Sequence, residues 1–198
     1  MSLSLPEDLY WLPTPEGAYY AVASSEETPQ RRFLCRLLSQ TETPRLTNES
    51  LPVWSEGSTP KEFLTLLNQL RARQWVQGLS SRMTVIDRPL EDIMPGLLTG
   101  LSDGGHALLA DSQGFYIASS GFPHQTAEEL AALSADLMTL HQRHQALLAE
   151  QLRIGQQSWG LIDAGGHSRL GIWPLHIGRH CFALVLSGIP HFNHPNFV

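Results

Sequence analysis

Two segments in the first 80 residues repeat apolar residues at three- and four-residue spacing, the pattern of an amphipathic helix. The first spans residues 30–40 and follows Thr28-Pro29; the second spans residues 61–73 and follows Thr59-Pro60. Threonine followed by proline is a typical helix start, because the hydroxyl caps free N–H groups and proline fits the first helical position. The sequence therefore predicts two capped helices.

Two short apolar segments, residues 17–23 and 74–79, predict strands on either side of these helices. Residues 1–17 contain three prolines among aromatic residues and predict an irregular arm. The order strand, helix, loop, helix, strand is weakly similar to a winged helix. We therefore assign residues 1–88 to a small, mainly helical, winged-helix-like accessory module.

A new pattern begins after Asp87-Arg88-Pro89, where we place the boundary of a second domain, residues 89–198. Residues 89–98 predict an irregular amphipathic helix that Pro95 kinks. Two apolar runs separated by a short linker with Gly114 predict a hairpin. The predicted strands of this half are residues 106–111, 115–119, 158–164, 169–176 and 179–187.

A long helix is predicted between these strands, over residues 126–152, with Thr126 and Glu129 as a capping box. One row on it repeats with three- and four-residue spacing, as in a coiled-coil seam, and comprises Leu130, Leu133, Leu137, Leu140, His144 and Leu147. A neighbouring row is made mostly of small residues: Ala127, Ala131, Ala135 and Met138. Both rows can enter one intramolecular core. We favour the alternative, in which the first row is an interface with a second copy or a partner.

The second half resembles the roadblock (dynein light chain roadblock) family over residues 89–188. The first predicted hairpin, LLADSQGFYIASSG, is similar to that family's first hairpin, and the run ELAALSADL is similar to the start of its central helix. The resemblance implies an α+β fold, in which a five-stranded antiparallel sheet carries helices on its faces. It also implies a homodimer that extends the sheet, and a non-enzymatic scaffold or regulator of small Ras-like GTPases, including those of bacterial gliding motility.

Two features depart from that family. Pro190 and Pro195 predict an extended C-terminal tail where the family often has a further helix. The first 88 residues also have no counterpart in the family, so a partner cannot be assigned from the fold alone.

Charge bears on a second hypothesis, a transcription regulator whose first module binds DNA while the second dimerises. The chain has a net charge of -6, and residues 1–88 hold nine Lys/Arg against ten Asp/Glu. Candidate nucleic-acid contacts are Lys61, Arg71 and Arg73, on or just after the second helix. An acidic balance does not favour binding to phosphates, so nucleic acid is the less favoured partner.

Motifs for catalysis are incomplete. Lys61 is the chain's one lysine and lies outside any Gly-rich phosphate loop. Residues 119–121, Ser-Ser-Gly, follow a predicted strand, but Ile117 occupies the first glycine position of a nucleophile elbow. Asp111 and Asp163 are predicted to shape turns. The sequence predicts no enzyme, no catalytic residue and no cofactor.

Three histidine pairs are candidate metal ligands: His141 with His144, His176 with His180, and His191 with His194. Zinc takes four ligands, and none of these pairs has a convincing third ligand nearby, so no metal site is predicted. The second pair flanks a predicted turn, which would let its two rings face each other.

The location of the protein is predicted from its cysteines and its hydropathy. Cys35 and Cys181 are predicted to be reduced and buried, as in a reducing compartment. The first residues lack the basic start and apolar run of a secretory signal, and no window of about 20 apolar residues could span a bilayer. We expect a cytoplasmic protein without membrane insertion.

Overall fold

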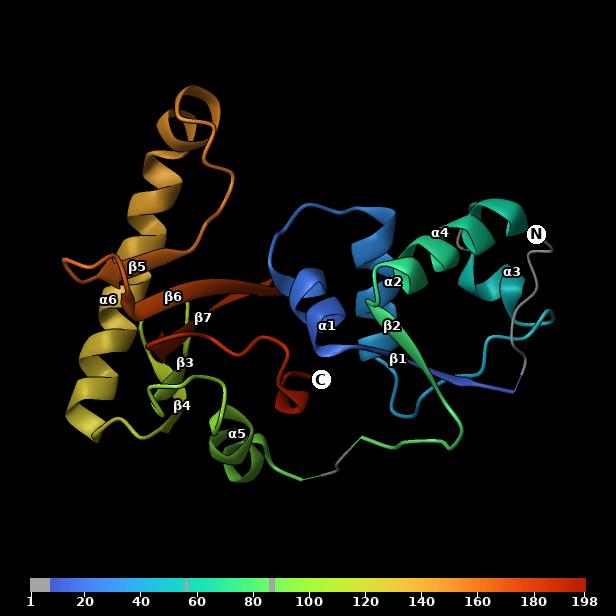
Figure 1. Cartoon of the computed structure of the whole chain (residues 1–198), viewed down its shortest axis with the longest axis horizontal. Helices are drawn as coiled ribbons and strands as arrows, with labels where there is room; N and C mark the ends of the chain where they lie inside the picture. The colour runs from blue at the N-terminus through green and yellow to red at the C-terminus, as the bar shows by residue number, and fades with distance from the viewer. Residues whose placement is uncertain (1–7, 56, 86–87) are drawn as a thin grey trace. The chain divides into compact units, whose positions relative to one another are not determined.

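The computed structural model describes residues 8–55, 57–85 and 88–198. The chain divides into two compact units, each with its own fold (Figure 1). Unit 1 comprises residues 1–22, 26–87 and 197–198, and unit 2 comprises residues 23–25 and 88–196. Asp87, part of the predicted boundary, lies outside the described residues.

Unit 1 is mainly helical. Its elements are β1 (Tyr10–Pro13), α1 (Pro15–Val22), α2 (Pro29–Leu38), α3 (Leu51–Trp54), α4 (Pro60–Ala72) and β2 (Val76–Leu79). Both predicted caps are confirmed: the Arg31 N–H donates to Thr28 Oγ1 (3.2 Å), and the Glu62 N–H donates to Thr59 Oγ1 (3.3 Å). The Glu62 carboxylate accepts the Thr59 N–H in return, completing a capping box.

The predictions for residues 10–22 are wrong, and residues 1–7 of the predicted arm lie outside the described residues. Residues 15–22 form helix α1 rather than a strand, and β1 lies where an irregular arm was predicted. Helix α1 begins with a third Thr-Pro pair, Thr14-Pro15, and the Gly17 N–H donates to Thr14 Oγ1 (3.2 Å). Because β1 precedes every helix and pairs antiparallel with β2, which follows them, the winged-helix arrangement is not confirmed.

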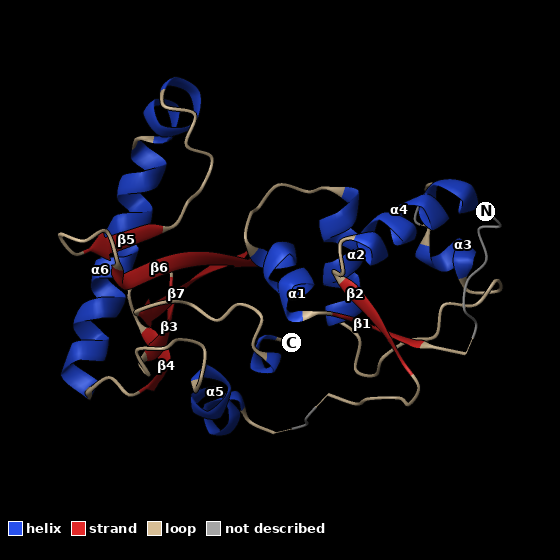
Figure 2. Cartoon of the chain, in the orientation of Figure 1, coloured by secondary structure: helices blue, strands red, loops and turns tan. Residues whose placement is uncertain are grey.

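Unit 2 has the predicted α+β fold. Its elements are α5 (Leu90–Leu98), β3 (Ala107–Asp111), β4 (Tyr116–Ser120), α6 (His124–Arg143), the π-helical turn η1 (Ala146–Gln151), β5 (Trp159–Ile162), β6 (Ser168–Ile177) and β7 (His180–Ser187). All strand pairs are antiparallel, in the order β4-β3-β7-β6-β5 (Figure 2). The five-stranded antiparallel sheet is therefore confirmed, with β4 and β5 as its edges.

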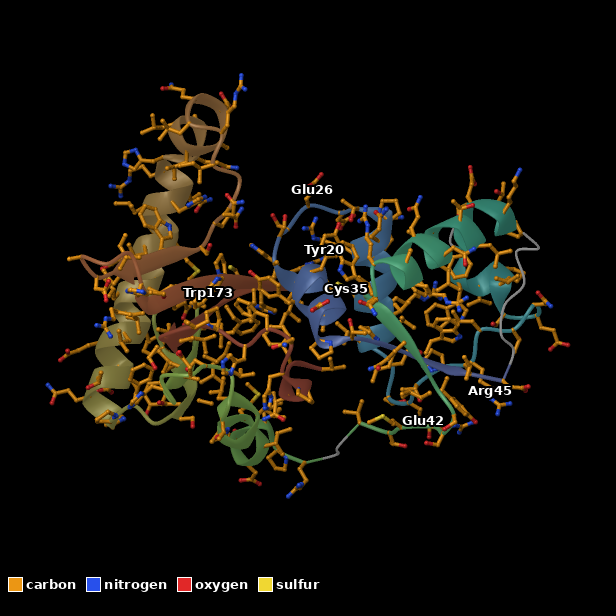
Figure 3. The ribbon with its side chains drawn as sticks, in the orientation of Figure 1. Tyr20, Glu26, Cys35, Glu42, Arg45 and Trp173 are labelled. Carbon is orange, nitrogen blue, oxygen red and sulfur yellow. The ribbon has the colours of Figure 1, made fainter. Side chains whose placement is uncertain are left out.

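The sheet is covered on both faces. On one face α6 packs over a core that includes Leu108, Ile172 and Val185. On the other, α5 contacts β4 and β3, and Phe192 from the C-terminal segment packs edge-to-face on Trp173 (ring centroids 5.3 Å apart; Trp173 is labelled in Figure 3). The central strands are therefore buried on both sides, which leaves function to the helices and the edges.

The ends of the long helix differ from the prediction. Helix α6 begins at His124 after Pro123, without a side-chain cap, so the capping box from Thr126 is wrong. It ends at Arg143, and a π-helical turn follows after a short break. Figure 1 shows this last part reaching beyond the strands, where no sheet supports a continuous helix. The predicted tail is not fully extended, because a short 3-10 helix (Pro195–Phe197) ends it.

Asp111 and Asp163 shape turns, as predicted. Asp111 Oδ1 accepts the N–H groups of Gln113 and Phe115, both at 2.9 Å. Asp163 Oδ1 accepts the N–H groups of Gly165 (2.8 Å) and His167 (3.0 Å), between β5 and β6. The second turn holds the edge strand β5 in register with β6.

Asp163 is expected to titrate below its ordinary pKa of 3.8 and to make unit 2 sensitive to acid. The His167 N–H is the largest cause of the lowered pKa, with smaller contributions from the Gly165 N–H and Arg169. A carboxyl with a lowered folded-state pKa stabilises the fold above its unfolded pKa and loses that contribution as the pH falls through the folded value. NMR titration of the Asp163 carboxyl checks this, and a pKa at or above 3.8 would contradict it.

Candidate interaction surface

Helix α6 faces its own sheet with small side chains. Ala127, Ala131 and Ser134 are fully buried, and Ser134 Oγ donates to the Leu130 carbonyl (2.7 Å), so the buried hydroxyl has a partner. Small residues on this face allow close approach of the helix to the strands. Of the predicted small row, Ala127 and Ala131 therefore serve the intramolecular core.

The predicted leucine row is divided between core and surface. Leu130 and Leu137 are half-buried against the core of unit 2. Leu133 and Leu140 are 41% and 39% exposed, although they lie on the same predicted row. The last two members lie beyond α6: exposed His144 is its C-cap, and Leu147 is in η1. The uncovered part of the row on α6 is thus centred on Leu133 and Leu140.

Two contacts show which way this row faces. On one flank of α6, the β3–β4 turn comes so close that a Cβ on Gly114 would lie 3.2 Å from Ala132 Cα and 3.5 Å from Ala135 Cβ. On another, the His141 ring meets Trp159 of β5 edge-on, with centroids 6.1 Å apart. Successive residues of an α-helix are about 100° apart around its axis, so Leu137 lies about 200° from Ala135 and points away from the β3–β4 turn. The leucine row therefore faces the β5 side.

Strand β5 adds apolar side chains to this surface. It is an edge strand that pairs only with β6, and Leu161 and Ile162 on it are 62% and 70% exposed. We define the α6–β5 surface as the set Leu130, Leu133, Leu137, Leu140, Leu161 and Ile162. Exposed apolar side chains on a helix and an unpaired strand edge in the same domain are both typical of protein–protein contacts.

The histidines do not gather into a metal site. Among the described residues, no three His, Cys, Asp or Glu side chains are placed to bind one ion. In the β6–β7 register His176 lies opposite Cys181, while His180 lies opposite Ile177. The prediction that His176 and His180 face each other is therefore wrong.

A pocket of about 370 Å³ lies between α6 and the ends of β6 and β7, with Met138, Gln157, His176 and Cys181 in its lining. Cys181 Sγ lies 3.9 Å from Met138 Sδ. Partial burial raises the pKa of the Cys181 thiol, which makes it a poor nucleophile at neutral pH. Cys181 is half-buried, whereas Cys35, labelled on α2 in Figure 3, is exposed, so its predicted burial is wrong.

The three predicted nucleic-acid contacts are spread along unit 1. Lys61 lies in the first turn of α4, whereas Arg71 lies in the last turn and Arg73 at the C-cap, so ten residues, about 15 Å of helix, separate Lys61 from Arg71. Arg71 stacks over Trp11 (5.8 Å) and Arg73 over Trp75 (4.9 Å). Both stacks give these arginines intramolecular roles, and a nucleic-acid contact stays a prediction.

Within the described part of the chain, none of the helices has the length and apolar character needed to cross a membrane. The predicted absence of a secretory signal concerns residues 1–8, of which residues 1–7 lie outside that part.

Comparison with known proteins gives a likeness to a solved structure. No family model matches the chain, and no curated protein matches it significantly. Among solved structures, the chain is similar to the crystal structure of a Roadblock/LC7 domain from Streptomyces avermitilis, with 18% identity, 50% of this chain and 79% of that chain covered, and a TM-score of 0.33.

Proposed function

We propose that this chain is a non-enzymatic adaptor that forms a homodimer through the α6–β5 surface of unit 2. The observations that carry the proposal are the exposure of Leu133 and Leu140, seven residues apart on α6, and the exposed apolar side chains of the edge strand β5. A seven-residue apolar repeat is suited to pairing with another helix, and an edge strand is suited to pairing with another strand. A second copy of the chain supplies both the partner helix and the partner strand.

The chemistry of the surface supports an adaptor rather than a catalyst. Its side chains are apolar, and partial burial raises the pKa of the Cys181 thiol in the neighbouring pocket. Apolar groups on a rigid helix and strand provide contact area and shape complementarity, which are what a protein partner requires.

Leu140→Glu is expected to convert the dimer into a folded monomer. Because the interface is symmetric, the substitution places two carboxylates in an apolar contact, and each must lose water without gaining a partner. Light scattering should show a fall from about 44 kDa, two chains of 22.0 kDa, to 22.0 kDa.

Leu90→Glu is the matched control. Leu90 is 62% exposed at the start of α5, outside the α6–β5 surface, and an acidic residue suits the first turn of a helix. This variant should stay dimeric. A dimer that survives Leu140→Glu would mean that the interface lies elsewhere.

We further propose that the dimer binds a small Ras-like GTPase or a signalling complex that contains one. The support is the resemblance of residues 89–188 to roadblock domains, which generally act on such GTPases. Each Ras-like GTPase of the same genome, purified and loaded with a non-hydrolysable GTP analogue, should be mixed with the dimer. A complex heavier than the dimer is the expected result, and an unchanged mass with every GTPase would refute the partner.

A further inference from the structure

A thiol, a thioether and an imidazole line the pocket between α6 and the ends of β6 and β7. Cys181 Sγ of β7 lies 3.9 Å from Met138 Sδ of α6. His176 of β6 lies opposite Cys181 in the antiparallel register, so the two side chains are on the same face of the sheet. All three residues line one cavity of about 370 Å³, which gives a ligand a path to them.

The separation of the two sulfur atoms suits one metal ion between them. With metal–sulfur bonds of about 2.3 Å, sulfur atoms 3.9 Å apart subtend about 115° at the ion, close to the angle of about 120° in trigonal coordination. A linear arrangement with the same bonds would need about 4.6 Å between the sulfur atoms. The geometry therefore calls for a third ligand.

His176 is suited to be that third ligand. Its Nε2 lies 3.2 Å from Gln157 Oε1, and because an amide oxygen only accepts hydrogen bonds, Nε2 carries the proton. The lone pair of the neutral ring is then on Nδ1. An imidazole that donates from one ring nitrogen to a fixed partner is the usual arrangement of a metal-bound histidine.

The lining of the pocket selects the kind of ion. Among the described residues that line it, none is Asp or Glu, and the polar side chains besides Cys181 are hydroxyls, amides and imidazoles. Mg²⁺ and Ca²⁺ take oxygen ligands, carboxylates above all, and structural zinc takes four ligands. Thiolate and thioether ligands instead favour Cu(I). The ligand set is therefore that of a soft, monovalent ion.

We propose that unit 2 binds one Cu(I) ion through Cys181 Sγ, Met138 Sδ and His176 Nδ1, independently of the homodimer. On binding, the S–H bond of Cys181 breaks, a sulfur–copper bond forms, and the proton passes to solvent. Copper and sulfur keep their oxidation states. Because each ion displaces one thiol proton, the affinity should rise about tenfold from pH 7 to pH 8.

Competition with bathocuproine disulfonate under anaerobic conditions tests the site. The Cu(I) complex of this chelator loses its colour when the protein removes the ion, which gives the stoichiometry and the Kd. The full chain with Cys35→Ser is the starting protein, because Cys35 is an exposed thiol that would bind copper by itself. This protein should take up one Cu(I) per chain.

Three further changes to the starting protein identify the ligands. Cys181→Ser should abolish uptake. Met138→Leu and His176→Gln should each weaken binding by at least about tenfold, since loss of even an outer partner of a metal ligand costs about 10- to 100-fold. Met83→Leu is the matched control, because Met83 is an exposed methionine of unit 1, and it should leave the Kd unchanged. Circular dichroism confirms that each variant is folded.

Three results would overturn the proposal. No uptake of Cu(I) by the folded starting protein would remove the site. An unchanged Kd in Met138→Leu would show that Cys181 binds copper as a single thiol. An unchanged Kd in His176→Gln would refute the trigonal ligand set.

Discussion

Gly17→Ala is expected to unfold unit 1, although helix propensity alone predicts that alanine stabilises the helix. In the interior of an exposed helix, this change stabilises by about 1 kcal/mol. Gly17 lies buried in α1, and a Cβ there would sit 2.0 Å from the Trp75 carbonyl oxygen. The Thr14 N–H donates to that oxygen (3.0 Å), which holds it in place. Because the Trp75 backbone would have to move, we expect the free energy of unfolding to fall by about 3 kcal/mol or more.

Gly96→Ala is the matched control for this prediction. Gly96 is exposed in helix α5, and a Cβ there would meet nothing within 4 Å. The same substitution should therefore stabilise unit 2 by about 0.5–1 kcal/mol. Hydrogen exchange read by mass spectrometry distinguishes the two units: peptides of α1 and α4 should lose protection in Gly17→Ala only. Unchanged protection there would show that the helix tolerates the side chain.

Ala131→Asp is expected to destabilise unit 2 by about 3–5 kcal/mol, because it buries a carboxylate without a partner. Ala131 is fully buried between α6 and the sheet, in the cluster that contains Leu108 and Val185. Urea unfolding followed by circular dichroism measures the loss. This prediction bears on function, because the face that Ala131 buries determines which leucines are left exposed.

Ala132→Asp, one residue further on, is the control. Ala132 is exposed, so a carboxylate there keeps its water and should change the free energy of unfolding by about 0.5 kcal/mol or less. Equal losses of stability at the two positions would mean that α6 does not turn the face with Ala131 toward the sheet. The assignment of Leu133 and Leu140 as exposed would then also be wrong.

Local signals in the sequence predicted most of the elements. Proline and threonine at helix starts act within a few residues, and the apolar runs of the strands are short and bounded by turns, so α2, α4 and the five strands of unit 2 appear near their predicted positions. Thr14-Pro15 carries the same start signal as the other two helices. It did not predict a helix because residues 17–23 are apolar and short enough to predict a strand equally well.

The candidate surface was predicted only in part, because orientation depends on tertiary contacts. Seven-residue spacing identified the leucine row, but only the position of the sheet shows that Leu137 is half-buried while Leu140 is exposed. Leu161 and Ile162 were not predicted as interface residues. Their exposure follows from β5 being an edge strand, and strand order is set by pairing between residues far apart in the chain.

Sedimentation of the unmodified protein over a range of concentrations tests the central claim most directly. If the α6–β5 surface joins two copies, the mass should approach about 44 kDa, twice 22.0 kDa, at tens of micromolar and fall toward 22.0 kDa on dilution. A mass of 22.0 kDa throughout that range would contradict the homodimer, and the exposed leucines of α6 would then need a different partner.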